Sequence, residues 1–134
     1  MESTGIVFDS YAILAFIEDE ENVDIVGNLI ADQKKEKYLS FLNLGEIYYI
    51  IERRHGTDAA EEVVDLIFLD DSITLCDVSW PRIKDAAHFK AGGGLSYADS
   101  FVLGLATELK VPVITGDPEI ENTANKIGIK IIRV

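Results

Sequence analysis

Short apolar runs alternate along this chain with longer stretches in which hydrophobic residues recur at helical spacing. The runs are rich in β-branched side chains, which is typical of buried strands. Strands are predicted at residues 5–8, 38–41, 73–76, 113–115 and 129–134. Helices are predicted at residues 11–17, 23–33, 44–55, 59–69, 80–90, 96–109 and 118–127. Alternation of this kind, with short connections, predicts an open α/β fold whose sheet is largely parallel.

Acidic residues follow several of the predicted strands. Asp9 comes directly after the first apolar run, Asp77 follows residues 73–76, and Asp117 lies two residues beyond Thr115. In open parallel sheets, ligands bind beyond the carboxyl ends of the strands, where the strand order reverses. Neighbouring strands on either side of that reversal would bring Asp9 and Asp117 together.

Two more acids lie near helix starts. We expect Asn43 to be the N-cap of one helix, with Glu46 in its first turn, and Ser96 with Asp99 to form a variant of the capping box. Glu46 and Asp99 each adjoin a core-facing stripe, so both are expected to point toward the edge of the sheet. Taken singly, each acid also has a structural explanation as a helix cap or as a partner of the helix dipole.

Taken together, Asp9, Glu46, Asp99 and Asp117 suggest a cation site. Two carboxylates 4 Å apart repel by about 4 kcal/mol at an effective dielectric constant of about 20, so converging acids do not stabilise a fold by themselves. Either the acids are spread apart or a cation binds them. Oxygen ligands suit Mg²⁺ or Mn²⁺, which support phosphodiester hydrolysis, and Thr115 could orient a ligand or a water molecule.

Composition and charge narrow the class of protein. With 134 residues, of which 48% are hydrophobic, the chain fits one domain over residues 1–134. A single cysteine allows no internal disulfide, and no apolar run approaches the ~18 residues that span a bilayer, so we expect a cytoplasmic protein. The net charge of −12 argues against a broad phosphate-binding surface but not against a local site.

The acidic motifs resemble those of the PIN-domain ribonucleases, and the small size of the chain is similar to that of VapC-type toxins of toxin–antitoxin pairs. The resemblance covers nearly the whole chain in order and spacing. It rests on Asp9 after an apolar strand, Asn43-x-x-Glu46, Gly94-Leu95-Ser96-Tyr97-Ala98-Asp99 and Thr115-Gly116-Asp117.

This resemblance implies a three-layer α/β/α sandwich around a parallel sheet of about five strands, with the first strand central beside the fourth. It implies a Mg²⁺- or Mn²⁺-dependent endoribonuclease that forms a homodimer and is inhibited by a small antitoxin protein. Asp9, Glu46 and Asp99 would be the central metal ligands and catalytic acids, and Asp117 the fourth and more peripheral acid. Thr115, Ser96 and Asn43 would support them.

Two alternatives remain open at this stage. A phospho-acceptor receiver domain also gathers acids around Mg²⁺ at strand ends, and Asp77 could be its acceptor, although no lysine follows a suitable final strand. A catalytically silent PIN scaffold would keep the fold without the chemistry.

Overall fold

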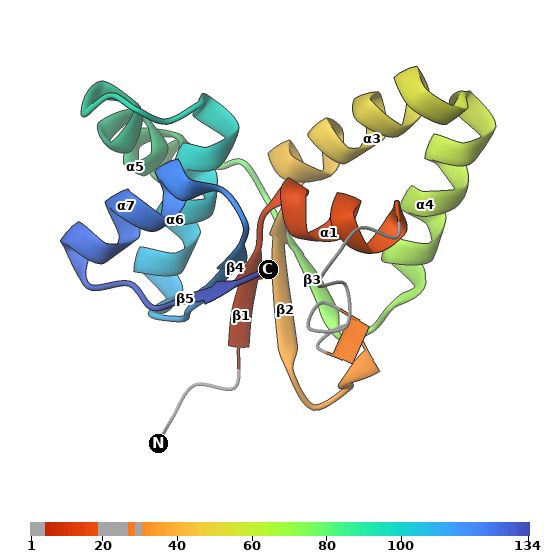
Figure 1. Cartoon of the computed structure of the whole chain (residues 1–134), viewed down its shortest axis with the longest axis horizontal. Helices are drawn as coiled ribbons and strands as arrows, with labels where there is room; N and C mark the ends of the chain where they lie inside the picture. The colour runs from red at the N-terminus through yellow and green to blue at the C-terminus, as the bar shows by residue number, and fades with distance from the viewer. Residues whose placement is uncertain (1–4, 19–26, 29–30) are drawn as a thin grey trace.

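A single parallel sheet organises the molecule (Figure 1). The computed structural model describes residues 5–18, 27–28 and 31–134. Its strands are β1 (Gly5–Phe8), β2 (Glu36–Ser40), β3 (Ile73–Cys76), β4 (Val113–Thr115) and β5 (Ile131–Arg133), in the order β3-β2-β1-β4-β5. All neighbouring strands are parallel, and β1 lies between β2 and β4. The first strand is therefore central beside the fourth, as expected.

Six helices within the described residues connect these strands. They are α1 (Ser10–Ile17), α3 (Phe41–His55), α4 (Thr57–Leu69), α5 (Trp80–Ala91), α6 (Tyr97–Leu109) and α7 (Pro118–Ile127). The helix predicted at 23–33 lies largely outside the described residues. No helix in the described part of the chain is both long and apolar enough to cross a membrane.

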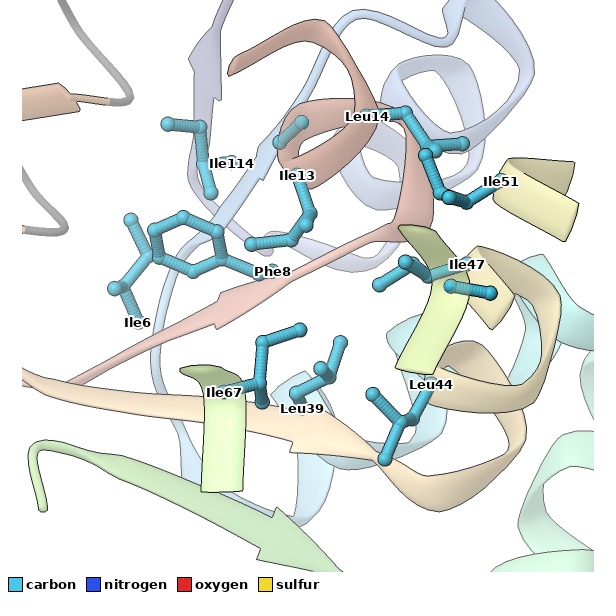
Figure 2. Packing of buried hydrophobic residues seen from close by; sticks show 12 residues of the cluster. Ile6, Phe8, Ile13, Leu14, Leu39, Leu44, Ile47, Ile51, Ile67 and Ile114 are labelled. Atoms are coloured by element: carbon cyan, nitrogen blue, oxygen red, sulfur yellow. The ribbon is translucent and has the colours of Figure 1, made fainter. Parts of the chain in front are cut away.

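The alternating side chains of β1 separate two cores. Ile6 and Phe8 face α1, α3 and α4, as the close view of that cluster shows (Figure 2). Val7 points to the opposite face, where it packs with residues of α6 and α7. Burying a side chain such as Phe8 contributes roughly 1.5–3 kcal/mol. With helices on both faces of the sheet, the predicted three-layer α/β/α sandwich is confirmed.

The boundary between β2 and α3 differs from the prediction. The strand covers Glu36–Ser40 instead of 38–41, and Phe41 is the first residue of the helix. Ser40 is the N-cap, because its Oγ accepts a hydrogen bond from the backbone N–H of Leu42 at 3.1 Å. The prediction of Asn43 as the N-cap was wrong: apolar Phe41 looked like a strand residue, yet it is 41% exposed at the helix start.

Other boundaries differ by smaller amounts. Helix α4 begins two residues before the predicted position 59, after Gly56, whose φ of 94° suits glycine. The last strand is shorter than 129–134, because it pairs with β4 only over residues 131–133. Strands β3 and β4 and helix α7 have the predicted bounds.

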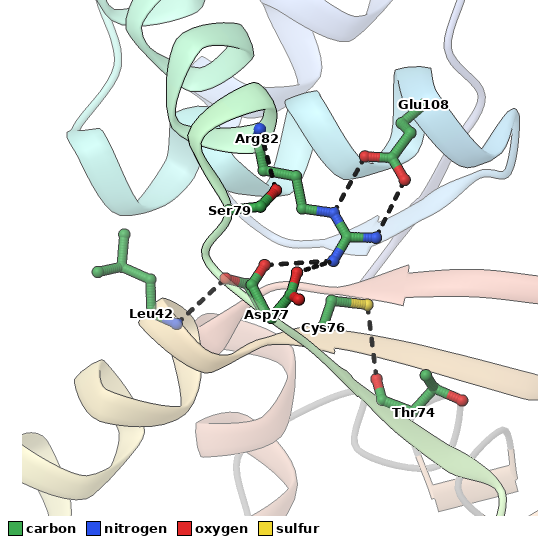
Figure 3. A network of polar contacts seen from close by, with 8 residues as sticks. Leu42, Thr74, Cys76, Asp77, Ser79, Arg82 and Glu108 are labelled. Atoms are coloured by element: carbon green, nitrogen blue, oxygen red, sulfur yellow. Dashed lines mark hydrogen bonds and ion pairs between the residues drawn. The ribbon is translucent and has the colours of Figure 1, made fainter.

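Arg82 fastens α5 to its neighbours on the β3 side of the sheet (Figure 3). Its guanidinium donates to both carboxylate oxygens of Glu108 in α6, at 3.1 and 3.0 Å, and to Asp77 Oδ1 at 2.7 Å. The hydrogen bonds from Arg82 hold the pKa of Glu108 below its ordinary value. Asp77, the acceptor that a receiver domain would need, is thus engaged in an ion pair at an edge strand.

Candidate active site

Asp9 is a buried acid at the carboxyl end of the central strand. It is only 2% exposed, and its Oδ1 accepts a hydrogen bond from the backbone N–H of Ala12 at 2.8 Å, which caps α1. Its Oδ2 accepts a hydrogen bond from the hydroxyl of Thr115, at the end of the neighbouring strand β4. Asp9 is therefore a helix cap, and it also joins the two strands on which the site is built.

Burial raises the pKa of Asp9 to about 7. The hydrogen bonds from Thr115 and Ala12 act in the opposite direction, because they favour the charged carboxylate. The negative charges of Asp99 and Asp117 add to the upward shift. Asp9 thus interacts electrostatically with two of the predicted site residues.

Asp117 lies two residues after Thr115 and is held by hydrogen bonds on both sides. Its backbone N–H donates to Thr115 Oγ1 at 2.9 Å, and its Oδ1 accepts from the backbone N–H of Glu119 at 2.8 Å. The second of these bonds makes Asp117 the N-cap of α7, where Pro118 occupies the first helical position. As expected from the strand order, Asp9 and Asp117 follow adjacent parallel strands.

Asp99 lies in the first turn of α6, as predicted. Ser96 is the N-cap, and its Oγ accepts a hydrogen bond from the backbone N–H of Asp99 at 3.1 Å. Burial raises the pKa of Asp99 to about 6, and Asp117 and Glu46 add to the shift. Asp99 is therefore the residue through which Glu46 is linked electrostatically to the other acids.

Glu46 is partly buried and lies in the second turn of α3 instead of the first. The prediction of a first-turn position was wrong because the helix starts at Phe41, earlier than the sequence suggested. The carboxylate nevertheless lies near enough to Asp99 to raise its pKa. The interaction of Glu46 with the helix dipole is therefore weaker than the sequence implied, because this interaction falls off beyond the first turn.

Asn43 joins three helix starts at this edge of the sheet. Its Nδ2 donates to the carbonyl oxygen of Ala98 at 3.2 Å and to Ser10 Oγ at 3.4 Å. The Ser10 hydroxyl donates in turn to the carbonyl oxygen of Asn43 at 3.3 Å. The buried Oδ1 of Asn43 makes no hydrogen bond within the described structure. Asn43 therefore positions Ala98, the residue before Asp99.

Ser10 and Tyr11 are residues at this edge that the sequence analysis did not single out. Ser10 is buried, whereas Tyr11 is 46% exposed beside Gly116. Their position directly after Asp9 was the available signal. The residues with which they make contact come from other parts of the chain, so the contacts themselves could not be read from the pattern.

The donor chemistry of the acids fits a divalent cation. The groups are all oxygen donors, and burial and mutual repulsion raise the pKa values of Asp9 and Asp99, which a bound cation would reverse. Within the described residues, no three His, Cys, Asp or Glu side chains are arranged as a ligand shell. The acids nevertheless lie close enough to raise the pKa values of Asp9 and Asp99, and Asp9, Glu46, Asp99 and Asp117 are the residues that would hold the ion.

Solved structures with this architecture include bacterial toxins. The chain is 15% identical to VapC20 of Mycobacterium tuberculosis, a sarcin-ricin loop cleaving toxin, with a TM-score of 0.72 over 88% of this chain and 94% of that chain. It is 18% identical to a chain of DNA-bound VapBC from Salmonella typhimurium, with a TM-score of 0.71 over 99% and 98% of the two chains. For a toxin–antitoxin complex from Klebsiella pneumoniae, the identity is 11% and the TM-score 0.61, over 84% and 86%.

At these identities the similarities establish the fold. The comparison with curated protein sequences gave no match. The sequence itself matches the PIN domain over residues 6–126, which include all the acids described above. The chain therefore belongs to the PIN domain family.

Proposed function

We propose that this protein is a metal-dependent endoribonuclease, the toxin component of a VapC-type toxin–antitoxin pair. The observation that carries the proposal is the gathering of Asp9, Asp99 and Asp117 at the carboxyl edge of β1 and β4, with raised pKa values for Asp9 and Asp99. Repulsion between these carboxylates destabilises the fold, and a bound cation would offset it. Membership of the PIN family supports hydrolysis of phosphodiester bonds.

The acids and the residues that position them have different tasks in this proposal. Asp9, Glu46, Asp99 and Asp117 would hold Mg²⁺ or Mn²⁺, and the bound ion would supply Lewis-acid stabilisation of the charge that develops on the phosphate. Thr115 orients the Asp9 carboxylate, and Ser96 fixes the backbone of Asp99. Asn43 holds the turn before Asp99 through the Ala98 carbonyl. Asp9 and Asp99 would lose their protons on ion binding, because only their charged forms are good ligands.

The biological setting follows from the same proposal. The similar structures from Salmonella typhimurium and Klebsiella pneumoniae are a VapBC assembly and a toxin–antitoxin complex. They support an antitoxin protein as the partner of this chain. A homodimer in the cytoplasm is part of the proposal, as the resemblance to VapC-type toxins implies. Single-stranded RNA is the proposed substrate.

An RNA-cleavage assay with Mn²⁺ tests the activity. We expect cleavage by the wild type, inhibition by EDTA, and a loss of at least about 100-fold in rate for Asp9→Asn, the range seen when a single electrostatic catalytic group is removed. Asp71→Asn is the matched control, because Asp71 is an exposed acid two residues before β3, at the amino end of that strand.

If the wild type and Asp9→Asn cleave RNA equally slowly, the activity is refuted and the silent scaffold is the remaining interpretation. A receiver domain is no longer an alternative, because the chain belongs to the PIN family and Asp77 is paired with Arg82.

A further inference from the structure

Tyr11 places an aromatic ring beside the candidate catalytic acids. It is the second residue of α1, two positions after Asp9, and it is 46% exposed. Its ring lies against Gly116, between Thr115, which donates to Asp9, and Asp117, which caps α7. The ring is therefore close to Asp9 along the chain and close to Asp117 through its contact with Gly116.

Gly116 leaves room for the ring because it has no side chain. A Cβ on residue 116 would overlap Cε1 of Tyr11 and would lie 3.0 Å from the carbonyl oxygen of Val134. The backbone there is also confined by Val134, directly after β5, whose N–H donates to the carbonyl oxygen of Thr115 at 3.2 Å. An exposed ring supported by backbone loses little conformational freedom when a ligand packs on it.

The charge of the protein makes such a contact important for an RNA substrate. With 24 acidic and 12 basic residues, the chain has a small supply of cations for phosphate contacts, which otherwise dominate affinity for nucleic acid. Stacking of unpaired bases on aromatic rings provides affinity that does not depend on net charge. A ring at the border of the acids is where a base next to the reacting phosphate would lie.

We infer that Tyr11 is a stacking platform for a nucleobase of single-stranded RNA that flanks the cleaved phosphate, and that Gly116 is present to let its ring rest there. This inference rests on the proposed function for its substrate class. It adds a substrate-positioning residue outside the acidic motifs.

Photochemical cross-linking tests the contact without requiring cleavage. Short single-stranded RNAs with 5-bromouridine at successive positions are irradiated with the Asp9→Asn protein in Mg²⁺, and the cross-linked peptide is identified by mass spectrometry. We expect the cross-link on Tyr11. The Asp9→Asn protein is then titrated with fluorescein-labelled RNA, with and without the additional substitution Tyr11→Ala. Tyr11→Ala should weaken binding by about 5- to 100-fold, the usual range for a stacked base.

Two substitutions separate stacking from other effects. Tyr11→Phe keeps the ring and should bind RNA as well as the parent, whereas Tyr11→Leu, which is apolar but not aromatic, should bind as poorly as Tyr11→Ala. Tyr49→Ala is the matched control, because Tyr49 is 45% exposed and its ring is occupied by Arg53 at 5.2 Å from the ring centroid. It should leave RNA affinity unchanged.

The inference is overturned if Tyr11→Ala and Tyr49→Ala bind RNA equally, or if Tyr11→Leu retains full affinity. Loss of dimer or of a protein partner in Tyr11→Ala, with RNA binding intact, would also overturn it and assign the ring to a protein contact. A wild type that binds and cross-links through Tyr11 but cleaves no RNA refutes the proposed activity alone.

Discussion

Asp9 has opposing roles in the fold and in the proposed site. Its two hydrogen bonds require a charged or accepting carboxylate, while burial raises its pKa to about 7. Because the pKa in the folded protein is higher than the ordinary value of 3.8, the folded state holds the proton more tightly than the unfolded chain. The contribution of Asp9 to stability is therefore fully present below about pH 4 and is lost as the pH rises toward 7.

We expect this loss in melting curves of the metal-free protein. In EDTA, the melting temperature of the wild type should fall relative to that of Asp9→Asn between about pH 4 and pH 7, because asparagine does not ionise. Differential scanning fluorimetry over that range measures the difference. Saturating Mn²⁺ should reduce it by stabilising the charged form. A difference that stays constant with pH would contradict the assigned environment of Asp9.

Thr115 provides a second test at the residue scale. Its hydroxyl lowers the pKa of Asp9 and accepts the N–H of Asp117, so Thr115→Val removes both bonds. We expect the acidic limb of the pH–rate profile to move to higher pH and the free energy of unfolding to fall by about 1–3 kcal/mol. Thr115→Ser retains the hydroxyl and is the control. An unmoved acidic limb in Thr115→Val would show that Thr115 does not tune Asp9.

At the scale of elements, Asn43 connects α1, α3 and α6 where these helices begin. Its side chain holds the Ala98 carbonyl and Ser10, and its backbone carbonyl accepts from Ser10. Because Asp99 directly follows Ala98, any change in this junction is transmitted to the site. Asn43 thus contributes through the position of α6 and not as the helix cap that its sequence context suggested.

We expect Asn43→Ala to reduce both stability and RNA cleavage. The Ala98 carbonyl would lose a buried partner, which costs about 1–3 kcal/mol, and α6 would be less firmly placed. Urea denaturation and single-turnover cleavage measure the two effects. Asn122→Ala, in α7, is the control for losing an asparagine within a helix. Unchanged cleavage with reduced stability would limit Asn43 to a structural role.

The sequence was informative wherever a local signal was unambiguous. Pro118 marks the start of α7, and Asp70 with Ser72 turns the chain into β3, so these bounds were predicted correctly. At the start of α3, the hydrophobicity of Phe41 extended the predicted strand by one residue, so Asn43 was predicted as the N-cap instead of Ser40. The short apolar run of β1 predicted a buried strand, and the resemblance to PIN-domain ribonucleases implied its central place.

The contacts around the site were less predictable because they join distant parts of the chain. That Thr115 donates to Asp9 depends on the pairing of β1 with β4, 106 residues apart. The fit between Tyr11 and Gly116 depends further on the carbonyl of Val134 beside them. Spacing in the sequence indicated which acids to consider but not how far each would be buried.

For the whole molecule, the surplus of negative charge predicts the salt dependence of RNA binding. If stacking and a bound ion supply much of the affinity, few phosphate contacts are needed. We expect log Kd to rise with log salt concentration with a slope of at most about 2, corresponding to about three contacts on a single strand. Fluorescence anisotropy of the Asp9→Asn protein at fixed Mg²⁺ and varied KCl measures the slope. A markedly steeper slope would indicate that contacts between basic residues and phosphates contribute more to the RNA affinity than stacking on the ring does.

The parallel arrangement of β1 and β5 also has a practical consequence for handling the protein. Gly5 opens β1 at the edge of the sheet away from the acids, whereas Val134 follows β5 and lies against Gly116 at the edge where they gather. A purification tag fused after Val134 would emerge beside Tyr11 and could obstruct substrate entry. Gly5 lies at the opposite edge of the sheet, so we expect the position of a tag to affect the measured activity.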